Sequence, residues 1–468
     1  MTDVTNAEPE AAQAPEPQSW LRSARGFLLP LVVVGVGLAV FDGVSAKNPV
    51  ARRGIGANRT PIYGYWTPSF TRWGIAAVVA AAIAGLLAFA LSRIESPRKR
   101  LILPVVVGLC LSFGTSLAII HGNPREFVGP LARVKGGYAD YAAEVPLVRQ
   151  LGIRTFIKDH PKLVRGHRLI SVHSRTHPPG PEVVVSILKK IFPGHLIPAA
   201  LILAFISSLV VVAAYFIALR VAGERAALIA AFLLAVAPAP GVFIFLSFDA
   251  VYATLLAGSA ALAVWGLSKN GRPLVAFLGG LVLGLSSIMT YAVLFVGLFA
   301  LIYAFFARPW KEAIRSLAYF ALGGIVALLV LRVALGYDFI ASYRASLFVV
   351  PHTKRSYLYW IFGNPAVWLT FAGLPIAAFA LRDLFFKRPV WLLAFLTPLL
   401  VADLTKIFPG ETERIGQFAT PFIAAAAGAA LVRWETASGR KRPLLIALLV
   451  VFTASQAIVL QALFNTIW

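Results

Sequence analysis

Residues 196–219 read LIPAALILAFISSLVVVAAYFIAL, an apolar run without a charged side chain. A helix of this length covers the roughly 30 Å of hydrocarbon in a bilayer. Similar runs recur along a chain of 468 residues that is 59% hydrophobic and 13% charged, which excludes a soluble globular protein. We therefore predict an all-α polytopic membrane protein with about thirteen transmembrane helices, near 26–43, 73–92, 101–121, 196–219, 225–243, 250–267, 273–290, 291–307, 315–336, 360–381, 389–405, 416–432 and 443–465.

The basic residues indicate how the spans are oriented. The formal net charge is +23, but Lys and Arg lie in small clusters between apolar runs and form no compact basic domain, which argues against nucleic-acid binding. With the N-terminus inside, every second loop is basic, and residues 44–72 form the exception among the outside loops. This orientation makes residues 1–19, rich in Ala, Pro and Glu, a disordered cytoplasmic tail, and residues 20–100 an N-terminal transmembrane hairpin.

The same orientation makes residues 122–195 one long outside loop. Two segments in it have helical patterns: 138–157, YADYAAEVPLVRQLGIRTFI, and 181–192, PEVVVSILKKIF. Both are too short and too polar to span a bilayer, so we expect two helices lying in the membrane interface.

The first interfacial segment carries two acids. Asp140 and Glu144 are four residues apart and share one helix face. A carboxylate in an apolar interfacial setting tends to have a raised pKa, which suits a general base. The alternative is a pair of solvated acids that form ion pairs with nearby Arg and Lys.

The stretch HSRTHPPGPEVVVSILKK, residues 173–190, opens the second segment. Its prolines fix the backbone, and Pro181 suits the first turn of a helix. Arg175 and His177 beside that helix start would suit a phosphate. The alternative is an ordinary rigid loop that leads into an interfacial helix.

Further charged residues lie at predicted outside ends of spans. Asp249 in SFD begins one span, where an N-cap and a functional role are equally plausible. Glu411 and Arg414 in GETERI begin another and could form a surface salt bridge or clamp a sugar or phosphate. Lys354 in PHTKRSYLYW adds positive charge on this side.

Several motifs are missing. The chain has no Walker A loop, Gly-rich dinucleotide fingerprint, HExxH or Asp-x-Asp pair. Its single cysteine, Cys110, allows neither an intramolecular disulfide nor a cysteine-based metal site. A soluble nucleotide-sugar or ATP-dependent enzyme is therefore unsupported.

Four stretches, YADYAAE (138–144), THPPGP (176–181), SFD (247–249) and GETERI (410–415), resemble the GT-C membrane glycosyltransferases. Within this superfamily the chain resembles the bacterial relatives of the protein O-mannosyltransferases and the lipid A aminoarabinose transferases. The resemblance implies a GT-C-like transmembrane catalytic domain over residues 101–465, in the bacterial inner membrane, with its active site on the extracytoplasmic face.

The resemblance also implies the chemistry. A sugar would move from a polyprenyl-phosphate donor to a glycan, lipid or protein, with inversion in a single displacement. Asp140 would be the base and Glu144 the second choice, while Arg175, His177, Asp249, Lys354, Glu411 and Arg414 would bind the donor phosphate and substrate. No cofactor or metal ligand set is implied, although a bound divalent ion is compatible with the chemistry. Asp42 would replace Asp140 if residues 26–43 were the family's first span.

Two other classes of protein remain as alternatives. A transporter or flippase for a lipid-linked or anionic substrate tends to place charges within spans and to show internal repeats, and neither is visible here. A non-catalytic scaffold of a cell-envelope complex would have no use for the cluster of Asp140 and HPPGP.

Overall fold

The computed structural model describes residues 30–40, 62, 65–66, 68–70, 72–93, 102–119, 139–166, 169–245, 247–349, 357–405, 407 and 410–465. Nearly all of these residues are helical, which confirms the prediction of an all-α protein. Apart from turns and short connections, the exception is an antiparallel pair of two-residue strands, in which β1 (Tyr65–Trp66) meets β2 (Phe464–Asn465).

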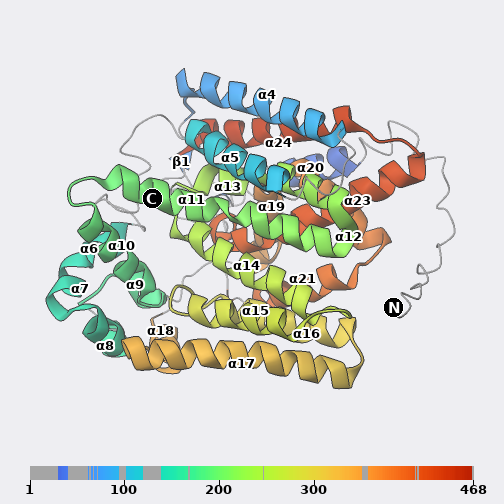
Figure 1. Cartoon of the computed structure of the whole chain (residues 1–468). Helices are drawn as coiled ribbons and strands as arrows, with labels where there is room; N and C mark the ends of the chain where they lie inside the picture. The colour runs from blue at the N-terminus through green and yellow to red at the C-terminus, as the bar shows by residue number, and fades with distance from the viewer. Residues whose placement is uncertain are drawn as a thin grey trace.

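The transmembrane part is a bundle of apolar helices (Figure 1). One side is formed by α4 (Arg72–Arg93), α5 (Ile102–Ile119) and α24 (Pro443–Leu463). The centre holds α11 (Leu196–Ser208), α12 (Val210–Ala235), α13 (Pro238–Phe243), α14 (Phe248–Leu267) and α23 (Thr420–Ser438). The opposite side holds α15 (Pro273–Ser286), α16 (Val293–Ala307) and α17 (Trp310–Leu335).

Shorter elements complete the bundle. The C-terminal half contributes α18 (Phe339–Leu347), α19 (Tyr357–Ala372), α20 (Leu374–Phe386), α21 (Val390–Leu404), α22 (Thr412–Ile415) and the 3₁₀ helix η2 (Gly416–Ala419). Near the N-terminus, residues Pro30–Val40 form a short apolar helix.

The predicted count of thirteen spans is not confirmed. Among the described residues, six helices are long and apolar enough to cross a membrane, or seven if α19 and α20, bent by 116°, are one span. Every predicted run still contains an apolar helix, but several are shortened. The break at Gly223 divides α12 where the sequence predicts a turn between two spans. Its φ of +84° lies in a region that glycine adopts without steric cost, because glycine has no Cβ.

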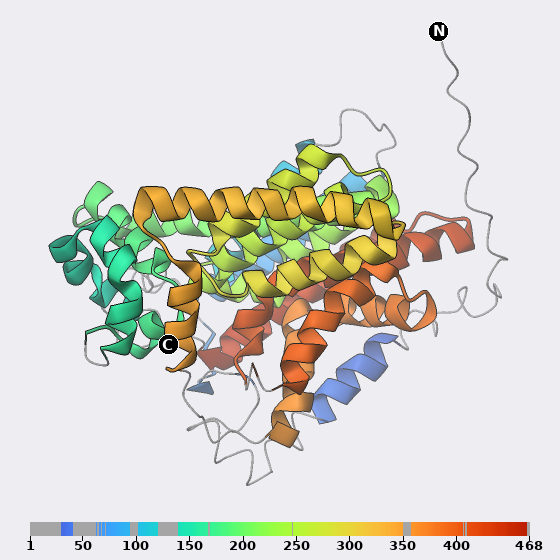
Figure 2. The same cartoon turned by 90° about the horizontal axis from the view of Figure 1, so that it is seen from below.

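The described part of the long loop forms a separate layer at one end of the bundle, as the teal helices at the left of both Figure 1 and Figure 2 show. It contains α6 (Ala139–Ala143), α7 (Val145–Leu151), α8 (Ile153–Arg165), α9 (Val172–Thr176) and α10 (Gly180–Ile191). The second predicted segment is α10. The first is three helices, because Pro146 starts α7 and Gly152, with φ +76°, separates it from α8.

The other end of the bundle is held by arginines. Arg225, beside the Gly223 break, pairs with Glu435 near the end of α23, with 2.8 Å between Nη2 and Oε1. Arg220 donates to Ser268 Oγ at the end of α14. Since α14 and α23 run away from the loop layer to reach these contacts, the basic end lies opposite the helices of the loop.

Candidate functional site

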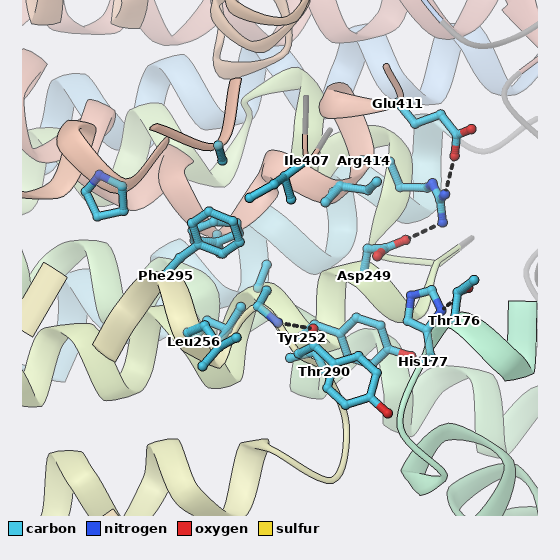
Figure 3. Close-up of a pocket in the computed structure, with 18 of the residues that line it drawn as sticks. Thr176, His177, Asp249, Tyr252, Leu256, Thr290, Phe295, Ile407, Glu411 and Arg414 are labelled. Carbon is cyan, nitrogen blue, oxygen red and sulfur yellow. Dashed lines mark hydrogen bonds and ion pairs between the residues drawn. The ribbon is translucent and has the colours of Figure 1, made fainter. Parts of the chain in front are cut away.

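A cavity of about 510 Å³ lies where the loop layer meets the bundle (Figure 3). It is bounded by α9, the start of α14, the connection between α15 and α16, the end of α21 and α22. One part of its lining is polar: His173, Thr176, His177, Asp249, Tyr252, Thr290, Tyr291, Tyr343, Glu411 and Arg414. The other part is apolar and includes Leu256, Leu294, Phe295, Leu298, Pro398, Val401 and Phe418.

Arg414 lies between two carboxylates at the polar end. Its Nη1 is 2.6 Å from Asp249 Oδ2, and its Nη2 is 2.6 Å from Glu411 Oε2. The Asp249 backbone N–H donates to the N-cap Ser247 hydroxyl, which in turn donates to Asp249 Oδ2 at 2.9 Å. The buried pair of Asp249 and Arg414 therefore joins the starts of α14 and α22, which are far apart in the sequence.

His177 belongs to an aromatic wall beside this cluster. Its ring stacks on His173, with centroids 6.3 Å apart, and Tyr141 meets it edge-on at 5.9 Å. Burial and, to a smaller extent, the neighbouring His173 ring lower the pKa of His177 from its ordinary 6.5 to about 4, although a hydrogen bond to the His173 carbonyl acts in the opposite direction. His177 is therefore neutral at pH 7 and brings no positive charge to the cavity.

The HPPGP segment fixes α10 against the connection between α15 and α16. The Gly180 backbone N–H donates to the Ile288 carbonyl at 2.8 Å, and a Cβ at position 180 would overlap that oxygen. Only glycine permits this approach of two backbones. Because Thr290 and Tyr291 follow directly, the segment sets the position of one wall of the cavity.

The first turn of α10 buries a carboxyl group behind that wall. Glu182 has no exposed surface, and no described donor forms a hydrogen bond of good geometry with either carboxyl oxygen. The nearby Ser174 side chain favours the charged form of this carboxyl group. Burial, with a smaller contribution from the nearby Glu144, raises the pKa of Glu182 from 4.5 to about 8.

Stability should therefore depend on pH through Glu182. Between pH 4.5 and about 8 the folded protein keeps a proton that the unfolded chain has lost, so stability falls as the pH rises through this window. In Glu182→Gln this loss should be absent, and the variant should exceed wild type in thermal midpoint more at pH 8 than at pH 5. Scans of detergent-solubilised protein test this, with the exposed Glu312→Gln as control. An equal pH response in wild type and Glu182→Gln would contradict it.

The structure brings four of the predicted site residues together: His177, Asp249, Glu411 and Arg414 all line the cavity. Arg175 does not line it; this side chain is buried and its Nε donates to the Val164 carbonyl at 3.0 Å. Glu144 does not line it either, and accepts a hydrogen bond from the Ser171 backbone N–H at 2.7 Å, at the start of α9.

The side chains of three predicted residues lie outside the described part of the structure. Asp140 belongs to α6, but its side chain lies outside the described part of the structure. Lys354 and the alternative acid Asp42 lie outside the described residues altogether. Their roles stay predictions.

Sequence reasoning missed several residues of the cavity. His173 could have been found, because it precedes His177 by four residues and so shares a helical face with it. Tyr252, Tyr291 and Tyr343 carried no such signal, since each sits in an apolar run or a short connection. Within the described ranges, no group of three or more His, Cys, Asp or Glu side chains could hold a metal ion.

The polar end of the cavity falls partly within a known family pattern. A family model described as dolichyl-phosphate-mannose-protein mannosyltransferase matches residues 176–337, about a third of the chain. The match begins within THPPGP and includes His177, Asp249 and Tyr291. It supports the resemblance to membrane glycosyltransferases of the GT-C superfamily.

Solved structures give more distant likenesses. ArnT from Cupriavidus metallidurans in the apo state is 15% identical, with 63% of this chain and 59% of that one covered and a TM-score of 0.41. The oligosaccharyltransferase of Archaeoglobus fulgidus is 14% identical both in its apo form (84% and 56% covered, TM-score 0.42) and in complex with Zn and sulfate (67% and 49%, TM-score 0.37). The chain thus spans about half to three-fifths of the length of these proteins. No curated protein sequence matches the chain.

Proposed function

We propose that the protein is a membrane glycosyltransferase that moves a sugar from a polyprenyl-phosphate donor to an extracytoplasmic glycan, lipid or protein. The observation that carries this proposal is the cavity itself, in which a polar end around Arg414 continues into an apolar end between helices. An amphipathic donor with a sugar, a phosphate and a prenyl chain fits such a lining. The family match over residues 176–337 also supports the proposal.

Arg414 is the proposed phosphate ligand. Of the described side chains that line the cavity, it is the only Lys or Arg. A guanidinium can bind phosphate oxygens in a bidentate manner and stabilise the charge that develops as phosphate leaves. Other residues that line the cavity supply polar groups for sugar hydroxyls: His173, Thr176, Tyr252, Tyr291 and Tyr343.

Asp140 is the proposed base. It lies on α6, which packs against α9 and α10, and its neighbour Tyr141 contacts the rings of His177 and Phe248. In the proposed step, Asp140 takes the proton of the acceptor hydroxyl as that oxygen attacks the anomeric carbon. The carbon–phosphate oxygen bond breaks, the phosphate leaves with the electron pair, and the anomeric centre is inverted. No step requires a metal ion, although a divalent ion beside the phosphate is compatible with it.

The proposed active face is extracytoplasmic. Two arginines beside the Gly223 break of α12 hold the ends of α14 and α23 at the opposite end of the bundle. Under the positive-inside rule that end is cytoplasmic, so the loop layer and the cavity would face outward.

Reconstituted protein with labelled polyprenyl-phosphate sugars tests the function through loss of donor and transfer to added acceptors. We expect Asp140→Asn to lower transfer by about 100-fold or more, since a positioned base contributes about that much. Asp159→Asn is the matched control in the same loop; Asp159 pairs with exposed Lys162, so transfer should stay unchanged. Wild-type transfer by Asp140→Asn would reject the assignment of the base. Accumulation of intact donor in vesicles without transfer would favour a flippase.

A further inference from the structure

Arg414 is neutralised by two carboxylates that are held very differently. Asp249 is fixed by the N-cap Ser247 and is buried, with 8% of its side chain exposed. Glu411 is 19% exposed and lies three residues from Arg414 in the same short segment. The first pair is part of the fold, whereas the second can separate by rotation of one more accessible side chain.

The backbone of Glu411 gives a second reason to single out this residue. Its φ of +63° lies in the left-handed region, which L side chains rarely adopt. Its carbonyl accepts hydrogen bonds from the Arg414 and Ile415 backbone N–H groups and so starts α22. The backbone is therefore anchored by its own bonds, and the carboxylate can leave Arg414 without unwinding the helix.

Among the described residues that line this end of the cavity, the charged groups disfavour an anionic substrate. With all three groups ionised, Asp249, Glu411 and Arg414 together carry one net negative charge. A phosphodiester also carries one negative charge, so it meets repulsion as long as both carboxylates remain on the guanidinium. Movement of Glu411 away from Arg414 removes this carboxylate from Nη2 and leaves the anchored pair with Asp249 intact.

We propose that Glu411 is an internal anion that exchanges with the donor phosphate on Arg414. The donor phosphate takes its place on Nη2 as substrate binds. After transfer, the product is a phosphate monoester with a charge of about −1.5 to −2, which binds a guanidinium more strongly than the diester does. The return of Glu411 to Arg414 displaces this product. The inference rests on the proposed function and assigns the same site a means of product release.

The test measures binding of geranyl phosphate, a short prenyl monophosphate without sugar, to the purified full-length protein in detergent. Glu411→Gln keeps the shape of the side chain but removes the competing charge, so we expect binding about tenfold tighter than in wild type. Arg414→Gln should abolish binding, in the wild-type and the Glu411→Gln background alike. Unchanged or weaker binding by Glu411→Gln overturns the inference.

A matched control separates exchange on Arg414 from a general change in charge. Asp403 near the end of α21 accepts a hydrogen bond from Asn364 at 2.7 Å and makes no ion pair with Arg414. Asp403→Asn therefore removes one nearby negative charge and should change binding less than twofold. Equal tightening in both variants overturns the inference. If Glu411→Gln fails to fold, Glu411→Gly deletes the same carboxylate and suits the positive φ.

Steady-state kinetics provide a further test, because a purely structural role of Glu411 would not lower KM and kcat together. Glu411→Gln should lower the KM for the donor and lower kcat by a similar factor, because product leaves more slowly. A kcat loss without a lower KM counts against the exchange. The outcomes for the proposed function are separate. If the wild-type protein transfers no sugar, the proposed function is rejected, whether or not geranyl phosphate binds. If the wild-type protein transfers sugar but Glu411→Gln does not bind geranyl phosphate more tightly, only the exchange is rejected.

Discussion

Arg414→Gln is expected to lower sugar transfer by at least about 100-fold, because removal of one preorganised charged group at a developing anion has effects of this size. The same change leaves Asp249 buried without its guanidinium. Breaking one side of a buried ion pair destabilises a protein by about 3–5 kcal/mol, so the thermal midpoint should fall as well. Transfer assays and thermal scans on the same preparation measure both effects.

A double variant separates the two effects of Arg414→Gln. Asp249→Asn with Arg414→Gln removes both charges and leaves two amide groups that can hydrogen-bond to each other. Most of the lost stability should return, while transfer should stay low because nothing replaces the cation. Recovery of transfer together with stability would show that Arg414 serves the fold alone, contrary to the proposed phosphate contact.

Gly280→Val should cause the second large effect, on assembly of the bundle. Helices α15 and α17 pack backbone to backbone, and a Cβ at Gly280 would overlap the Phe320 carbonyl oxygen, just as one at Gly323 would overlap that of Phe277. Small residues allow such close approach between membrane helices. A branched side chain must force the helices apart, at a loss of about 3 kcal/mol or more. Thermal unfolding of detergent-purified protein should show a much lower midpoint or no folded protein.

The consequences of Gly280→Val should reach the cavity. The end of α15 leads directly into residues 287–292, which carry Thr290 and Tyr291, so a displaced α15 moves one wall of the site. Gly258→Ala in α14 is the matched control, because a Cβ there meets no atom within 4 Å and alanine favours a helix. Its stability should not fall, and can rise by up to about 1 kcal/mol. Equal behaviour of the two variants would exclude tight packing at Gly280.

The class of protein could be predicted from local sequence alone. Long apolar runs require helices in a bilayer, because each backbone polar group must then be satisfied within its own segment. The pattern of prolines likewise placed the start of α10 at HPPGP, where it lies in the structure. Local composition predicted the break at Gly223 but could not count the spans, since the bend of 116° between α19 and α20, inside one predicted run, depends on how neighbouring helices pack.

The candidate site shows the same division. Sequence position marked Asp249, Glu411 and Arg414 as charged groups at the ends of apolar runs, where such groups are rarely without a role. It marked His177 as part of the rigid HPPGP segment in the long loop. Nothing in the sequence paired Asp249 with Arg414, because they are 165 residues apart and meet only where α14 and α22 pack together. Arg175 carried the same local signal, yet its side chain turns to the Val164 carbonyl at the end of α8. Hydrophobicity and turn chemistry act over a few residues and determined the helices, whereas the direction of each buried charge depends on partners that only the packed bundle supplies.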